Sequence, residues 1–126
     1  MKTPELGSLY QQLILEHYRK PRNKRDLPGA TADVHMRNPT CGDEVHLKLT
    51  VNEGRIDDVA FTGEGCSISQ AAVSMMTQQL KGASVADAMD LARAFTRMMH
   101  GDPEPAGDRR LGDLRALQGV HQFPVR

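Results

Sequence analysis

The sequence has little of what drives binding to nucleic acids or membranes. Its sixteen basic and sixteen acidic residues give a formal net charge of zero, so it lacks the broad positive surface of a nucleic-acid-binding protein. No apolar run approaches the roughly eighteen residues of a membrane helix, and the polar start at residues 1–5 lacks the apolar region of a signal peptide. We therefore expect a cytoplasmic protein whose partners are proteins or small molecules.

Aromatic residues and cysteines are also scarce. There is no tryptophan, and only three phenylalanines and two tyrosines are present, so aliphatic side chains and the seven methionines must fill the core. The length of 126 residues, with 39% hydrophobic and 25% charged residues, fits a single domain over residues 1–126. The two cysteines would stay reduced in the cytoplasm, which favours catalytic or metal-binding thiols over a structural disulfide.

The spacing of apolar residues predicts helices and an antiparallel sheet. Helices are expected at about 4–19, 67–81, 84–99 and 111–117, and half-buried strands at about 30–37, 44–51 and 56–62. A tight turn at residues 52–55 (NEGR) would make the strands a meander with one packed and one exposed face. The residues expected to face the core from the second and third helices are Ala72, Val73, Met76 and Leu80, followed by Val85, Ala88, Met89, Ala92, Phe95 and Met99.

Several polar segments can be interpreted either as functional or simply as exposed, solvated parts of the chain. Residues 19–25 hold five of the sixteen basic residues, and form either a docking patch for a partner or an exposed connection. Asp57 and Asp58 are most simply a solvated pair. Residues 101–108 are rich in proline and glycine and predict a loop, and Gly119 predicts the end of the last helix.

The two cysteines lie in short segments shaped by proline and glycine, residues 38–43 (NPTCGD) and 63–69 (GEGCSIS). The strands between them would bring the segments together as one site. Cys66 is expected at a helix N-terminus, where the helix dipole favours the thiolate. Cys41 and Asp43, separated only by Gly42, can direct sulfur and oxygen to one point. Two thiolates and a carboxylate suit zinc, or iron bound with sulfide, although inert buried cysteines or a redox disulfide remain alternatives by spacing alone.

The sequences of these two segments closely resemble the motifs of the iron–sulfur scaffold family of IscU, SufU and the N-terminal domain of NifU. The likeness extends to residues 17–23 (HYRKPRN), 111–114 (LGDL) and 117–120 (LQGV), and so covers nearly the whole chain. Residues 101–119 resemble the SufU branch more than IscU. The resemblance implies a small α+β sandwich, of the SufE/NifU-like kind, in which a three-stranded antiparallel sheet packs against helices.

The resemblance also implies a metal site of Cys41, Asp43, Cys66 and a third cysteine. In SufU-like members the metal is zinc. A SufS-like cysteine desulfurase carrying pyridoxal phosphate docks, and the thiol matching Cys41 accepts persulfide sulfur, so such a member is a zinc-dependent, sulfurtransferase-like partner of that enzyme. Its recipients would be a SUF scaffold or iron–sulfur apo-proteins. In IscU-like members the same ligands hold a nascent [2Fe–2S] cluster, which is passed to apo-proteins.

One departure concerns the third cysteine, which the family places a few residues beyond the stretch matching 123–126 (FPVR), leading into a last helix. We expect this cysteine and helix to lie beyond Arg126. The alternative is a degenerate interaction protein without the third cysteine.

A histidine is the other candidate for a fourth ligand. His121 is the best placed, because the family's final ligand belongs to the same part of the chain. His35 and His46 are expected on the solvated face of the strands, His17 partly buried on the inner stripe of the first helix, and His100 at a helix C-terminus, where the dipole favours a cation.

Overall fold

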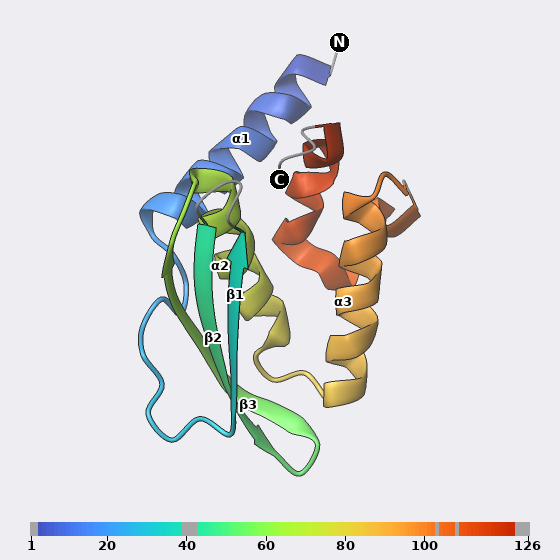
Figure 1. Ribbon diagram of the computed structural model, residues 1–126. Coiled ribbons are helices and arrows are strands. Elements are labelled where there is room, and N and C mark those ends of the chain that lie inside the picture. The colour runs from blue at the N-terminus through green and yellow to red at the C-terminus, as the bar shows by residue number, and fades with distance from the viewer. Residues whose placement is uncertain (1–2, 39–42, 103, 108, 123–126) are drawn as a thin grey trace.

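The fold is an antiparallel sheet packed against helices. The computed structural model describes residues 3–38, 43–102, 104–107 and 109–122. Its elements, in order, are α1 (Thr3–Arg19), β1 (Ala32–Asn38), β2 (Asp43–Asn52), β3 (Arg55–Glu64), α2 (Ser67–Leu80), α3 (Val85–Met99) and the 3₁₀ helices η1 (Glu104–Gly107) and η2 (Arg109–Gln122) (Figure 1). The expected α+β class and three-stranded antiparallel sheet are confirmed. None of the helices described here is long and apolar enough to cross a membrane.

The sheet is a meander with strand order β1-β2-β3. Glu53 and Gly54 connect β2 to β3 with φ angles of 53° and 75°. Two positive φ values are what a type I′ hairpin turn requires, so the predicted turn is confirmed. The register shifts between Thr50 and Val51, where a β-bulge interrupts the ladder. This hairpin brings the end of β3 back beside the start of β2.

The basic stretch after α1 is built into the edge of this sheet. The N–H of Phe61 donates to the carbonyl of Asn23 at 2.9 Å, and the N–H of Arg25 donates to the carbonyl of Phe61 at 2.9 Å. The Arg25 guanidinium also donates to both carboxylate oxygens of Asp58, at 2.9 and 3.0 Å. This hydrogen bond is the main reason that the pKa of Asp58 lies below its ordinary value. The interpretation of Asp58 as merely solvated is therefore wrong, and part of the basic stretch has a structural role.

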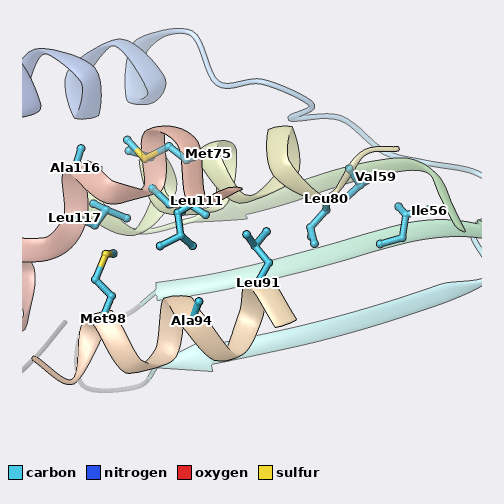
Figure 2. Close-up of a cluster of buried hydrophobic side chains, with 12 residues drawn as sticks. Ile56, Val59, Met75, Leu80, Leu91, Ala94, Met98, Leu111, Ala116 and Leu117 are labelled. Carbon is cyan, nitrogen blue, oxygen red and sulfur yellow. The ribbon is translucent and has the colours of Figure 1, made fainter. Parts of the chain in front are cut away.

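The core lies between β3, α2, α3 and η2, as Figure 2 shows. Met75 of α2 and Met98 of α3 are fully buried, and Met76 and Met99 pack at the edge of the same cluster. Unbranched methionine side chains fill irregular gaps well, which confirms the role expected for them in a chain poor in aromatic residues. The buried cluster consists of Ile56, Val59, Ala71, Met75, Leu80, Leu91, Ala94, Met98, Leu111, Leu114, Ala116 and Leu117.

Two of the expected helix faces are only partly right. Leu80 is buried, and Ala72, Met76, Ala88, Phe95 and Met99 pack at the edge of the core, but the most buried side of each helix is a different one. The fully packed side of α3 carries Leu91, Ala94 and Met98, whereas Val85 and Met89 are exposed. The buried stripe is thus rotated by about one residue, or about 100°, because η2 packs against α3 and selects that side. In α2 the buried residues include polar ones, because the helix contacts α1, β3 and η2. They are Gln70, Ala71, Ser74, Met75, Thr77 and Leu80.

The strands also differ from the expected half-buried pattern. Val34 and Met36 of β1 are 43% and 45% exposed, because among the described elements the helices pack over β3 rather than over β1. At the opposite edge, three consecutive residues of β3, Val59, Ala60 and Phe61, are buried. The segment after α1 hydrogen-bonds to the backbone of Phe61 there and so covers the free edge of β3.

The last helix is longer than expected. It runs from Arg109 to Gln122 as a 3₁₀ helix with a kink at Gly112, whose φ and ψ are 55° and −132°, so Gly119 does not end it. The preceding segment expected as a loop contains the short η1. Gly112 tolerates the kink because it has no side chain, and a Cβ there would lie 2.3 Å from Nε2 of Gln79.

A buried polar junction joins these helices. His17 is fully buried, and its Nε2–H donates to Oδ2 of Asp113 at 3.0 Å. Its Nδ1 then accepts from the hydroxyl of Ser74 at 2.7 Å, and the same Ser74 oxygen accepts the N–H of Arg22 at 2.8 Å. We call His17, Ser74, Asp113 and Arg22 the His17 junction. It ties α1 to α2 and η2, and buries His17 more deeply than the sequence suggests.

Candidate functional site

Cys66 begins α2 as its N-cap residue. Its φ and ψ of −72° and 166° are extended, and its Sγ accepts the N–H of Ser69 at 3.4 Å. The Cys66 carbonyl accepts the Ser69 hydroxyl at 3.0 Å and the N–H of Gln70 at 3.1 Å. The thiol is therefore fixed beside the positive end of the helix dipole, as the sequence predicts. It is a free, partly buried thiol.

Asp43 lies at the start of β2, directly beside this helix start. Its Oδ1 accepts the backbone N–H of Cys66 at 3.0 Å. The contact follows from the meander, because Glu44 pairs with Glu64 and so places Asp43 next to Gly65. The structure thus brings together two of the three predicted site residues, from segments 23 positions apart.

Two glycines make this close approach possible. A Cβ on Gly65 would lie 2.3 Å from Oδ1 of Asp43 and 2.7 Å from Oγ of Ser69. A Cβ on Gly63 would lie 2.1 Å from the carbonyl oxygen of Glu44. Both contacts are far too short for any side chain, so glycine at both positions is a steric requirement of the site.

The third predicted residue, Cys41, lies outside the described residues, as does Gly42. The described donors are the Cys66 thiol and the Asp43 carboxylate, whose Oδ2 has no hydrogen bond among the residues that the structure describes. Within those residues no group of three or more His, Cys, Asp or Glu side chains is arranged to hold a metal ion. A thiolate and a carboxylate are nonetheless a donor pair that zinc accepts, so the residues present fit that metal.

Comparison with known proteins identifies the family. The family described as "NifU-like N terminal domain" matches residues 9–126. This chain belongs to the NifU-like N-terminal domain family.

Individual relatives agree with this family. The chain is 46% identical over 121 residues to a protein named zinc-dependent sulfurtransferase SufU from Bacillus subtilis, covering 96% of this chain and 81% of the relative. It is 40% identical over 126 residues to a protein named iron–sulfur cluster assembly scaffold protein IscU from Streptococcus pyogenes, covering 100% of this chain and 78% of the relative. A crystal structure of a protein described as hypothetical superposes with a TM-score of 0.87 at 39% identity, covering 94% of this chain and 86% of that one.

Within this NifU-like domain, four of the five histidines weighed as a fourth ligand have other contacts or positions in the fold. His17 is committed to the buried junction, and His100 is the C-cap of α3, as expected. His35 and His46 are exposed on the sheet, also as expected, with side chains 48% and 42% accessible. The side chain of His121, the preferred substitute, lies outside the described residues.

The sequence interpretation missed two residues of this domain's site. Ser69 donates its N–H to the Cys66 sulfur and its hydroxyl to the Cys66 carbonyl, and its position three residues after the N-cap is the signal that could have identified it. Gln70 follows in the same turn. Its side-chain amide is buried, and neither amide atom has a hydrogen-bond partner among the described residues. Nothing in the sequence marks this glutamine, because its burial depends on the packing of α2.

Proposed function

We propose that this chain is an iron–sulfur cluster assembly protein that accepts sulfur on Cys41 from a cysteine desulfurase, with zinc held by Cys41, Asp43 and Cys66. The observation that carries the proposal is the hydrogen bond from the Cys66 N–H to Asp43, which joins the two site segments. The name of the Bacillus subtilis relative, a zinc-dependent sulfurtransferase, supports it. The proposal takes residues 1–126 as one such domain, acting in the cytoplasm.

The donor set supports zinc as the metal. Bound zinc would hold the thiols in the deprotonated form, the form that reacts with sulfur donors. Cys66 would be the fixed ligand, because its backbone N–H, carbonyl and sulfur all take part in hydrogen bonds. Asp43 would offer Oδ2 while Oδ1 stays on the Cys66 N–H. Cys41, one glycine away from Asp43 in the sequence, would be the sulfur acceptor.

The sulfur step is balanced without an external oxidant. The Cys41 thiolate attacks the outer sulfur of a cysteine persulfide on the desulfurase, a pyridoxal phosphate enzyme. A sulfur–sulfur bond forms at Cys41 while the bond in the donor breaks, which leaves a persulfide on Cys41 and a thiolate on the desulfurase. The sulfur would then pass to a SUF scaffold or to an iron–sulfur apo-protein.

A second candidate function is that of a scaffold. It is favoured by the Streptococcus pyogenes relative, which is named an iron–sulfur cluster assembly scaffold protein. In that case Cys41, Asp43 and Cys66 would hold a nascent [2Fe–2S] cluster as cargo. The single carboxylate among thiolates would make the cluster easier to release, because oxygen is a weaker ligand than sulfur for this iron.

The test compares the two functions on one purified protein. For a sulfur acceptor we expect about one bound zinc per chain, faster turnover of a SufS-like desulfurase, and one extra sulfur on the peptide that contains Cys41 by mass spectrometry. Cys41→Ser should abolish both the stimulation and the added sulfur, and the exposed control Asp57→Asn should change neither. Stimulation that survives Cys41→Ser would overturn the proposal. A coloured cluster that displaces zinc on reconstitution with iron and cysteine under argon would favour the scaffold.

A further inference from the structure

The outer face of the sheet carries a histidine pair outside the candidate site. His35 of β1 and His46 of β2 are direct partners in the antiparallel register. Their rings stack, with centroids 5.0 Å apart and an angle of 20° between the planes. Side chains alternate along a strand, so His46 projects from the face of β2 opposite to that of Asp43. The pair is therefore separate from the Cys66 region.

Each ring of the pair is held by a carboxylate from the other strand. Nε2 of His35 lies 2.6 Å from Oε2 of Glu44, and Nε2 of His46 contacts Oδ1 of Asp33. An ionised carboxylate only accepts hydrogen bonds, so each Nε2 donates to its carboxylate, and Nδ1 is the nitrogen of each ring that can bind an ion when it carries no proton. Metal-binding histidines usually have this arrangement, with the second nitrogen bound to a carboxylate that fixes the ring and makes it more basic.

The surrounding charge also favours a cation. Glu44 pairs in register with Glu64 of β3 on its other side, and like charges directly opposite each other destabilise a sheet. Lys48, which is in register with Asp33, donates to Asp26 at 2.7 Å and so divides its charge between the two carboxylates. The histidine pair thus lies in a locally negative part of the outer face, although Arg37 opposite Glu44 offsets some of this charge.

We propose that His35 and His46 bind a divalent transition metal ion on this face, through one nitrogen of each imidazole. Two nitrogens on one such ion lie at most about 4.2 Å apart, given metal–nitrogen bonds of about 2.0–2.1 Å. The two rings are stacked and nearly parallel, with centroids 5.0 Å apart, so their in-plane lone pairs do not converge in this arrangement. Both side chains are exposed, so each ring can turn about its χ angles until one nitrogen of each faces the ion. Since the described residues offer no third His, Cys, Asp or Glu positioned for the ion, water completes the coordination. Such a site exchanges its ion readily.

The probe is Ni²⁺, whose unpaired electrons broaden the proton resonances of the histidines that bind it. The titration uses the whole chain and, in parallel, a Cys41→Ser/Cys66→Ser variant in which thiols cannot bind the ion. We expect the ring signals of His35 and His46 to broaden together, at Ni²⁺ concentrations at which exposed His100 and buried His17 stay sharp. If the His100 signals broadened at the same Ni²⁺ concentration as those of His35 and His46, the ion would be binding exposed histidines in general, and the proposal would be overturned.

Single substitutions test whether the two rings act together. His35→Gln and His46→Gln should each raise at least fivefold the Ni²⁺ concentration needed to broaden the remaining partner, and the matched control His100→Gln should not. A smaller change would overturn the proposal. Nitrogen correlation spectra at alkaline pH provide a second measurement, in which both rings should show the Nε2–H tautomer, and the Nδ1–H tautomer would contradict the geometry. Since the double-serine variant lacks the thiols, a failure here is distinguishable from a failure of the proposed sulfur transfer.

Discussion

The first turn and the middle of α2 are held in place in different ways. At the first turn, the N–H of Cys66 donates to Oδ1 of Asp43, which is its one hydrogen bond to another described element, and glycine allows the close approach. In the middle, Ser74 and Thr77 are fully buried and bond to residues from other segments. The difference indicates that the two parts of α2 have separate roles. The middle fixes the helix in the fold. At the first turn the Cys66 sulfur accepts only the N–H of Ser69, and Oδ2 of Asp43 has no hydrogen bond, among the residues that the structure describes.

The largest effect on stability is expected from removing His17 of α1, which bonds to Ser74 in the middle of α2. His17→Ala removes the partner of Ser74 and Asp113 and leaves a buried cavity, which should lower the free energy of unfolding by about 2–4 kcal/mol. The control is His100→Ala, since His100 caps α3 through its backbone N–H and should cost less than about 0.5 kcal/mol. Urea unfolding followed by circular dichroism measures both. Similar losses for the two variants would show that the His17 junction contributes little.

A smaller, localised effect is expected at the first turn. Gly65→Ala places a Cβ 2.3 Å from Oδ1 of Asp43 and should displace the carboxylate from Cys66. We expect zinc affinity to fall at least tenfold, about 1.4 kcal/mol in binding free energy, as measured by competition with a chromophoric chelator. Gly82→Ala, just beyond the other end of α2, is the matched control, because its φ is +87° with no atom within 4 Å of the added carbon.

The control should lose about 1 kcal/mol of stability from backbone strain and keep its zinc affinity. Equal zinc binding in the two alanine variants would contradict the role of the Gly65 contact. The comparison therefore separates damage to the site from damage to the helix.

The first turn and the middle of α2 also differ in how well the sequence predicts them. The helix start at Cys66 was predictable, because glycines precede it and helical periodicity follows it, both local signals. The contact with Asp43 was expected only in outline, since it depends on the exact pairing of Glu44 with Glu64. The position of Cys41 in the site stays a prediction.

The middle of α2 was not predictable from the same kind of signal. Ser74 and Thr77 are polar, so the stripe of apolar residues predicted to face the core did not include them. Their burial depends on partners far away in the sequence, which are His17, 57 positions from Ser74, and Asn23, 54 positions from Thr77. The face of α3 was missed for a related reason. Two stripes were available on that helix, and its packing against η2 selects the one with Leu91 and Met98.

The smallest effect is expected where the two regions meet, at Gln70. Gln70 is 3% exposed, and its amide oxygen and nitrogen both lack a partner within the part of the chain that the structure describes. Its buried neighbours Ser74 and Thr77 are hydrogen-bonded. A buried polar group without a partner costs about 1–3 kcal/mol, and an apolar group of similar shape avoids that cost. Gln70→Met should therefore raise the free energy of unfolding by about 1 kcal/mol, measured by urea unfolding of the zinc-free protein.

The direction of that change decides which region Gln70 belongs to. A stabilised variant with unchanged zinc affinity would assign Gln70 to the packed middle of the helix, as a polar residue that the core tolerates. A destabilised variant would contradict the prediction, because it would mean that the amide has a bonded partner. If zinc affinity fell as well, the partner would lie at the first turn. Ser74→Ala serves as the reference, since it removes a hydroxyl that is fully bonded and should destabilise by about 1–3 kcal/mol.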